Sequence, residues 1–153
     1  MCIRDRLIYT TRMPVRWGDM DAYGHVNNVQ FVRLLEDARV AMLLQWFPEG
    51  LEQLDRGIVV ARHEIDYLAP LSYRPEPVAV DVWVTRIGGA SYDIGYVIRD
   101  PQAAGHTRYA VAETTLALFN LRDGAPRRMS GEERSQLEVH LGDPAPLRSR
   151  RSL

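Results

Sequence analysis

The sequence predicts an α+β fold in which an antiparallel sheet of about five strands curves around one long central helix. Apolar residues recur at helical spacing across residues 28–46, and the two-residue alternation of strands dominates the chain that follows. Only short connections separate the strand segments, and strands joined by tight turns pair antiparallel. A sheet wrapped around the apolar helix accounts for both patterns with a single core.

The composition is that of an ordinary globular domain. The chain has 153 residues, of which 46% are hydrophobic and 25% charged, and its formal net charge is -1. This balance gives no electrostatic basis for binding nucleic acid or an anionic membrane surface. No apolar run approaches the roughly 18 residues of a membrane-spanning helix, and the N-terminus has no secretory signal pattern. We therefore expect a cytoplasmic protein without nucleic-acid or membrane partners.

Cysteine and histidine usage argues against a disulfide and a metal site. Cys2 is the only cysteine, so no intramolecular disulfide is possible. The four histidines, at positions 25, 63, 106 and 140, have no cysteine or histidine partner at metal-ligand spacing. We therefore expect no metal or redox cofactor.

Both ends of the chain are expected to lie outside the folded domain. The first five residues, MCIRD, resemble the translation of a sequencing adapter, so we interpret residues 1–6 as non-native. Residues 144–153 contain arginines, prolines and serines without an apolar pattern. We predict a domain over residues 7–140 and a disordered tail over residues 141–153.

The first element is a predicted strand over residues 7–17, which are rich in β-branched and aromatic types. Pro14 cannot donate to a hydrogen-bonded ladder, so this strand should lie at a sheet edge or carry a bulge. A polar turn with two glycines and two aspartates follows at residues 18–25.

The central helix is predicted over residues 28–46. Asn27 or Asn28 can cap its N-terminus, and Pro48 and Gly50 end it. Its apolar residues extend most of the way around the helix. We therefore expect the helix to be largely enclosed by the rest of the protein.

Four strand segments follow the helix, at residues 57–68, 77–87, 91–99 and 106–121. In the second of these, four valines share one parity, which is the alternation of a half-buried strand. Gly88 and Gly89 predict a turn between the second and third segments. Ser130 and Glu133 have the spacing of a capping box, which predicts a short helix after the last strand.

The segment that leads into the central helix contains the candidate catalytic residue. The first turn of a helix leaves backbone N–H groups unpaired and carries a partial positive charge, and donors fixed there can stabilise an oxyanion on a carbonyl group. Asp21 lies on the turn leading into the helix, where its carboxylate could attack that carbonyl carbon or take a proton from water. His25 is a candidate to polarise the substrate or orient Asp21.

The same residues also have purely structural interpretations. Aspartates and glycines in a turn before a helix commonly cap it or hydrogen-bond the backbone. We favour such a role for Asp19, and His25 can be an ordinary loop residue. Asn27 and Asn28 are more often caps than ligands. The spacing alone therefore leaves both interpretations of Asp21 open.

The stretch from Trp17 to Asn28, WGDMDAYGHVNN, resembles the hot-dog thioesterases of the 4-hydroxybenzoyl-CoA thioesterase type, in their Gly-His-Val-Asn-Asn variant. Residues 31–39, 65–70 and 118–126 are also similar to that family, and the resemblance spans residues 7–135. It implies the hot-dog fold. It further implies an acyl-CoA thioesterase that hydrolyses a fatty or aromatic acyl-CoA to free acid and CoA, with an aspartate as nucleophile or general base.

The resemblance also implies roles for particular residues. The catalytic aspartate of the family falls on Asp21, and the backbone N–H that polarises the thioester carbonyl falls on Asn28. The family's acidic helix position falls on Glu36, for which we favour an ion pair with Arg33 or Arg39. With the pocket expected along the helix and the next strand, the substrate-binding residues we expect are Asn27, Phe31, Glu36, Tyr67 and Ser91.

The contacts to the CoA phosphates are left open by the resemblance. Ser91 matches the family's serine at the CoA-facing turn. Some members carry basic residues just before this serine, where the present chain has Gly88, Gly89 and Ala90. We expect the phosphate contacts to come from elsewhere, with Arg86, Arg62 and a partner subunit as candidates.

Three further alternatives concern the activity and the assembly. The acyl donor could be an acyl-carrier protein in place of CoA, or the chain could bind acyl-CoA without hydrolysing it. A second group of hot-dog thioesterases uses a glutamate of the central helix, which would be Glu36 here. The family typically forms homodimers or homotetramers with active sites between subunits, so we expect one of these assemblies.

Overall fold

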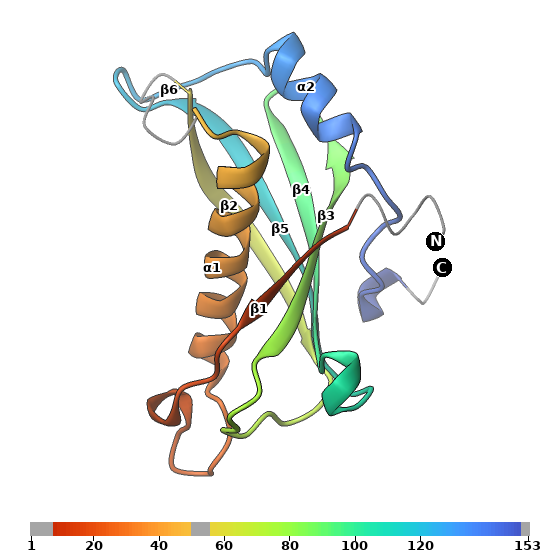
Figure 1. The fold of residues 1–153 in the computed structure, drawn as a ribbon. Coiled ribbons are helices and arrows are strands. Elements are labelled where there is room, and N and C mark those ends of the chain that lie inside the picture. Colours follow the sequence, from red (N-terminus) through yellow and green to blue (C-terminus); the bar gives the residue numbers. More distant parts are fainter. Residues whose placement is uncertain (1–7, 50–55, 151–153) are drawn as a thin grey trace.

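The fold is a curled antiparallel sheet wrapped around one long helix, α1 (Asn28–Trp46), as Figure 1 shows. The computed structural model describes residues 8–49 and 56–150. The strands are β1 (Tyr9–Met13), β2 (Gly57–Tyr67), β3 (Val78–Ile87), β4 (Ser91–Arg99), β5 (Arg108–Asn120) and the short β6 (Ala125–Pro126). Their order is β1-β3-β4-β5-β2, with β6 paired to β5, and every pairing is antiparallel. The predicted fold class is confirmed.

Strand β1 lies at one edge of the sheet, where it pairs only with β3. The predicted edge position is confirmed, and the strand ends at Met13, directly before Pro14. The proline has no N–H to continue the ladder. The proposed non-native residues 1–6 lie outside the described part of the chain.

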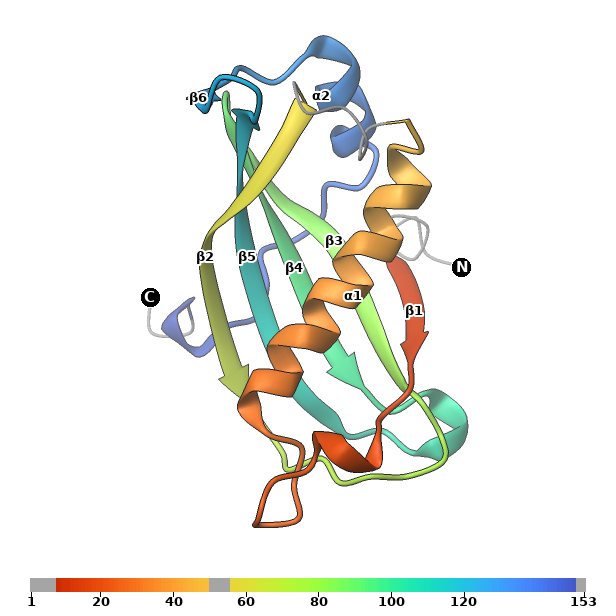
Figure 2. The same ribbon diagram turned by 90° about the vertical axis from the view of Figure 1, so that its left-hand side faces the viewer.

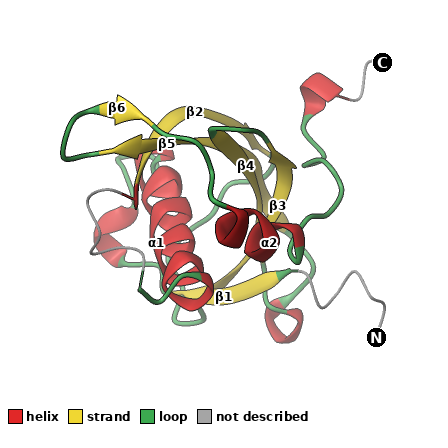
Figure 3. Cartoon of the chain, turned by 90° about the horizontal axis from the view of Figure 1, so that it is seen from above, coloured by secondary structure: helices red, strands yellow, loops and turns green. Residues whose placement is uncertain are grey.

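Helix α1 packs one face against the inner side of the sheet, which Figure 3 shows curling around it. The Asn27 side chain accepts a hydrogen bond from the N–H of Val29 and so caps the helix, as predicted. Phe47 follows the last helical residue, and Gly50, one of the predicted stop signals, lies outside the described residues. The helix residues that are buried against the core are Phe31, Leu34, Leu35, Ala38, Arg39, Met42, Leu43 and Trp46.

The opposite face of α1 is not enclosed by this chain, contrary to the expectation from its composition. Val29, Val40 and Leu44 are 65%, 41% and 51% exposed. The reason is geometric, because the sheet covers only one side of the helix, and the other side faces outward in Figure 2. Next to this face lies β2, the strand at the second edge of the sheet.

The middle of the sheet is buried on both faces, although the alternating valines of β3 predicted one buried face. The inner residues of β3 and β4 pack against α1, while Trp83 and Val97 on the outer side join a separate cluster. That cluster is completed by Ala145 and Leu147 from the C-terminal segment. The outer face is therefore covered by the chain's own last residues.

The C-terminal segment differs from the disordered tail that its composition predicted. Leu147 is fully buried, and the Trp83 indole donates to the carbonyl of Asp143 at 2.7 Å. Beyond it, the 3-10 helix η5 (Arg148–Arg150) places Arg150 in an ion pair with the buried Glu113 of β5. The C-terminal segment is therefore held in place by the side chains of Ala145 and Leu147 and by the ion pair of Arg150, although its sequence has no periodic apolar pattern. Residues 151–153 lie outside the described part.

Helix α2 (Gly131–Glu138) forms where the capping box predicted a helix. The Ser130 hydroxyl accepts from the N–H of Glu133, and the Glu133 carboxylate accepts from the N–H of Ser130. Arg127 holds the same carboxylate at 2.8 Å, and Leu137 buries the helix against the core. Helix α2 closes the end of the sheet near the carboxyl end of α1 (Figure 1). Within the described residues, no helix is long and apolar enough to span a membrane.

Candidate functional site

The connection from β1 to α1 folds back on itself through residues 18–27, which we call the acid turn. The N–H of Asp21 donates to the carbonyl of His25 at 2.9 Å, and the N–H of Gly24 donates to the carbonyl of Asp21 at 3.0 Å. Gly24 has a φ of 76°, a left-handed conformation that glycine adopts without a steric cost. The turn therefore depends on a glycine at this position to bring Asp21 back toward the helix.

Asp19 anchors the acid turn to helix α1. The residue is 1% exposed, and its carboxylate accepts hydrogen bonds from the backbone and guanidinium of Arg16. Arg33 of α1 reaches the same carboxylate at 2.9 Å. Burial by itself would raise the pKa of Asp19, but the hydrogen bonds from Arg16 and the charge of Arg33 outweigh it and leave the pKa lowered. Asp19 thus has the structural role that the sequence suggested.

Asp21, in contrast, is exposed and carries no ion pair among the described residues. One carboxylate oxygen accepts from the N–H of Tyr23 at 2.9 Å, and the other accepts from the side-chain amide of Asn27 at 3.3 Å. The amide oxygen of Asn27 is the cap of α1 and accepts from Val29. A single asparagine side chain therefore joins the Asp21 carboxylate to the first turn of the helix.

The first helical residue, Asn28, offers an N–H donor at this place. The N–H groups of Gln30 and Phe31 both donate to the carbonyl of Asn27, and that of Val29 is taken by the cap. No acceptor for the Asn28 N–H is found within the described residues. Such a donor at a helix N-terminus is suited to hold a developing oxyanion.

Two aromatic rings lie beside the helix start. Phe31 is buried and meets Tyr67 of β2 edge-to-face, with 5.3 Å between ring centroids. The Tyr67 hydroxyl donates to the carbonyl of Asn28 at 3.5 Å, and partial burial raises the pKa of this hydroxyl. Both candidate substrate-binding residues are therefore near the acid turn. His25 contributes its backbone carbonyl to the turn, and its side chain is exposed.

Ser91 is not brought near Asp21 within one chain. It begins β4 at the opposite end of the sheet, where its hydroxyl accepts from Arg86 at 2.9 Å. The two arginines that we considered as ligands of the CoA phosphates already form ion pairs with carboxylates of the same chain. Arg86 binds Asp93 at 2.9 Å and Arg62 binds Glu64 at 3.0 Å.

The ion pair that we favoured for Glu36 is not formed among the described residues. Arg33 bonds Asp37 and Asp19, while Arg39 donates to the Tyr96 hydroxyl at 3.2 Å. Glu36 itself is exposed on the outer side of α1.

A polar cluster between α1 and the sheet, which the sequence pattern did not predict, joins the buried Arg39, Tyr96 and Thr114 to the exposed His63 of β2. Arg39 is 7% exposed and contacts Tyr96, and the His63 ring shares a hydrogen bond of 2.8 Å with Thr114. Burial, with a further contribution from the Arg39 charge, lowers the pKa of His63. The sequence feature that could have predicted this cluster is Arg39, an arginine on the otherwise apolar face of the helix. The described residues contain no group of three or more histidine, cysteine, aspartate or glutamate side chains placed to hold a metal ion.

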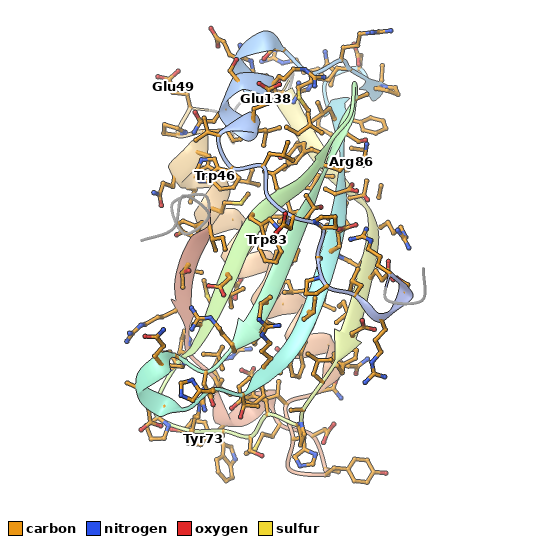
Figure 4. All side chains as sticks on the ribbon, turned by 90° about the vertical axis from the view of Figure 1, so that its right-hand side faces the viewer. Trp46, Glu49, Tyr73, Trp83, Arg86 and Glu138 are labelled. Atoms are coloured by element: carbon orange, nitrogen blue, oxygen red, sulfur yellow. The ribbon has the colours of Figure 1, made fainter. Side chains whose placement is uncertain are left out.

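A cavity of about 340 Å³ lies at the other end of α1 from the acid turn. Its apolar lining comes from the last turns of α1, from β2 and from β4, and α2 contributes polar side chains at its rim. Figure 4 labels Trp46 and Glu49 at this end and Tyr73, which contacts Trp17 beside the acid turn, at the opposite end. The cavity was not anticipated because its lining comes from four separate elements.

Comparison with known proteins identifies the family. The model of the Thioesterase-like superfamily matches residues 15–144. A predicted thioesterase from Bacillus stearothermophilus is 26% identical with a TM-score of 0.79, and the match covers 90% of this chain and 98% of that one. A thioesterase from Thermus thermophilus, solved with coenzyme A and zinc, is 28% identical with a TM-score of 0.75 over 90% of this chain and 96% of that one.

A third solved structure, the PA2801 protein of Pseudomonas aeruginosa, is 32% identical with a TM-score of 0.72. The match covers 83% of this chain and 95% of that one. No curated protein matches the chain significantly. The family match over most of the chain, together with the curled sheet around α1, shows that this protein belongs to the Thioesterase-like superfamily and is a thioester hydrolase with the hot-dog fold.

Proposed function

We propose that the protein hydrolyses acyl-CoA thioesters, with Asp21 as its catalytic carboxylate and the Asn28 N–H as the donor to the thioester carbonyl. The observation that carries the proposal is the hydrogen bond from Asn27 to Asp21. It holds an exposed carboxylate beside a helix start whose Asn28 N–H has no acceptor in the described chain. The solved relative with bound coenzyme A supports CoA as the acyl donor.

The reaction follows from these two groups. The Asn28 N–H and the partial positive charge of the helix N-terminus stabilise negative charge on the carbonyl oxygen. Asp21 either attacks the carbonyl carbon or takes a proton from the water that attacks it.

In the first route the carbon–sulfur bond breaks to leave a mixed anhydride on Asp21, and a water molecule then hydrolyses this anhydride to the free acid and restores the carboxylate. In the second route the water oxygen bonds the carbonyl carbon and the carbon–sulfur bond then breaks. In both routes a proton from the consumed water ends on the leaving thiolate, so the products are the free acid and CoA. Each oxygen of Asp21 accepts one hydrogen bond, so each keeps a lone pair for this chemistry.

We also propose that the protein works as a homodimer built on β2. This strand is eleven residues long, and its outer edge pairs with no other described strand. Val60 is 43% exposed there, and the exposed apolar face of α1 lies alongside. A two-fold axis at His63 would set Arg62 of each chain opposite the partner's Glu64. Such an edge, left bare, is a template for pairing with a second copy.

The decisive test of the catalytic proposal is Asp21→Asn, which keeps the size and hydrogen-bonding shape of the side chain but removes its charge. We expect kcat for acyl-CoA hydrolysis to fall by about 10²–10⁴-fold, the range that such a group contributes. Released thiol is the readout, and circular dichroism and gel filtration should be unchanged. Asp123→Asn is the matched control, because Asp123 also accepts a backbone N–H in an exposed turn.

Retention of most activity in Asp21→Asn would refute the role of Asp21. The acyl donor is tested separately on the unaltered protein. Equal concentrations of an acyl-CoA and of the same acyl group on a carrier protein are compared by kcat/KM. A higher value for the carrier-protein substrate would contradict the assignment of CoA as the donor.

A further inference from the structure

Residues 71–74, which we call the brace loop, belong to the connection between β2 and β3 and pass beside the acid turn (Figure 2). The carbonyl of Leu71 accepts from the N–H of Val26 at 2.6 Å, and the Ser72 hydroxyl donates to the carbonyl of Gly24 at 3.0 Å. Leu71 is 2% exposed and packs in the main core, which fixes the start of the loop. The brace loop therefore holds the half of the acid turn that leads into α1.

The brace loop also contacts the other half of the acid turn. The N–H of Tyr73 donates to the sulfur of Met20 at 3.4 Å, and the Tyr73 ring meets that of Trp17 edge-to-face, with 5.7 Å between centroids. Asp21 lies in the chain between Met20 and Gly24, and both of these residues accept hydrogen bonds from the brace loop. The position of the loop therefore determines the position of the proposed catalytic carboxylate.

Arg74, the last residue of the brace loop, attaches the loop to the sheet. Its guanidinium forms an ion pair with Asp100, and its Nη1 donates to the Tyr109 hydroxyl at 3.1 Å. The guanidinium also lies over the Tyr109 ring, 5.5 Å from the ring centroid. Asp100 directly follows β4 and Tyr109 belongs to β5, so a single side chain joins the loop to the ends of two strands.

Asp100 is a well-fixed acceptor for this attachment. The residue is 5% exposed, and its carboxylate also accepts from the Tyr109 hydroxyl at 2.6 Å and from the N–H of Thr107 at 3.3 Å. Burial by itself would raise the pKa of Asp100, but the hydrogen bonds from Tyr109 and Arg74 outweigh it and leave the pKa lowered. The carboxylate is therefore ionised and oriented at neutral pH.

The arrangement around Arg74 is not the one that stability alone favours. Its Nε and Nη2 are buried and have no acceptor in the described part of the chain. A buried donor without a partner costs free energy, and apolar side chains of similar volume often replace a buried ion pair without loss of stability. In contrast to an apolar contact, charge-assisted hydrogen bonds fix the direction of the groups that they join. The attachment therefore provides a defined orientation of the brace loop.

We propose that Arg74 is a positioning residue for thioester hydrolysis. By fixing the brace loop to the sheet, it holds Asp21 opposite the N–H of Asn28 without itself taking part in the reaction. The inference rests on the function proposed above. A displacement of about 1 Å can lower a catalytic rate by about 10²-fold. Loss of the attachment should therefore lower kcat, while KM stays nearly unchanged because the residues that contact the substrate are retained.

Arg74→Met tests this role, because methionine keeps an apolar stem and removes the guanidinium. We expect kcat for acyl-CoA hydrolysis to fall by about tenfold or more, measured at a temperature at which circular dichroism shows the variant to be folded. Arg74→Lys keeps a cation beside Asp100 and should recover most of this loss. The matched control is Leu147→Ala, which removes a buried side chain on the outer face of the sheet and should keep the kcat of the unaltered protein. An unchanged kcat in Arg74→Met, or an equal loss in Leu147→Ala, would overturn the proposal.

Ser72→Ala tests the other end of the brace loop and decides the matter if Arg74→Met does not fold. Ser72 is exposed, so its replacement should leave the melting temperature nearly constant. Loss of its bond to Gly24 should lower kcat by about two- to tenfold, the value of one hydrogen bond. An unchanged kcat in Ser72→Ala would mean that the loop does not hold the acid turn, which contradicts the proposal.

A double-mutant cycle shows whether Arg74 acts through Asp21. In the Asp21→Asn background, Arg74→Met should lower the residual rate by less than about threefold, because no catalytic carboxylate is left to misplace. The same loss in both backgrounds would mean that the two residues act independently and would overturn the inference. High activity of Asp21→Asn alone would instead refute the proposed function, so the two failures are distinguishable.

Discussion

Asn27 has two roles in the acid turn, because it caps α1 and also holds the side chain of Asp21. Its amide oxygen caps α1 through Val29, and its amide nitrogen donates to Asp21 at 3.3 Å. One side chain thus stabilises the helix whose first N–H is the proposed oxyanion donor, and also positions the proposed catalytic carboxylate. Asp19, two residues before Asp21, is buried and paired with Arg33, so the two aspartates of the turn have different environments.

Replacing Asn27 by serine should separate its two functions. A serine hydroxyl still caps the helix, but it cannot also donate to Asp21 in the same geometry. We expect kcat to fall by about tenfold while the melting temperature stays nearly constant, as measured by thiol release and calorimetry. Asn27→Ala should lose both functions, with a loss of about 0.5–2 kcal/mol in stability. Full activity of Asn27→Ser would mean that Asp21 needs no support from this amide.

The C-terminal segment acts at the level of an element. It runs across the outer face of the sheet, forms a bridge between Leu141 and Val84, and buries Ala145 and Leu147 against Trp83. This arrangement explains why β4 is buried on both faces although it belongs to a sheet with one helix-covered side. The segment therefore contributes a second apolar layer to a small domain.

Leu147→Ala should lower the free energy of unfolding by about 2–5 kcal/mol, because it removes a fully buried side chain and leaves a cavity. Chemical denaturation followed by tryptophan fluorescence measures this change, since Trp83 packs in the same cluster. Leu141→Ala is the control, because the Leu141 side chain is 42% exposed and its loss should cost much less. Equal losses in the two variants would show that the segment is not packed as described.

At the scale of the whole molecule, one side of a single chain has a strand edge without a pairing partner and apolar side chains exposed to solvent. The free edge of β2 and the exposed face of α1 lie side by side (Figure 2), and both carry apolar side chains. The acid turn lies at one end of α1 and the cavity at the other. Pairing of two copies along β2 would cover this apolar surface.

Val60→Lys should prevent this pairing, because a charged side chain on a strand edge opposes the addition of another strand. Sedimentation velocity should show a monomer of 17.5 kDa in place of a dimer, with a loss of thioester hydrolysis in parallel. Ile8→Lys, which places the same charge next to β1 at the opposite edge, should leave both properties unchanged. A monomeric but fully active Val60→Lys protein would contradict the dependence of the site on a second chain.

Local sequence determined the elements of this protein and the composition of its acid turn. The apolar period of residues 28–46 with its Asn27 cap, the alternation of the four strand segments and the capping box at Ser130 each depend on neighbours within a few residues. The tertiary structure alone decided which partners the distant side chains have. The ion pair of Asp19 with Arg33, the burial of Leu147 and the cavity that Tyr92 shares with α1 and α2 join residues far apart in the chain. Such contacts form only after the sheet has curled around the helix, so no local pattern can encode them.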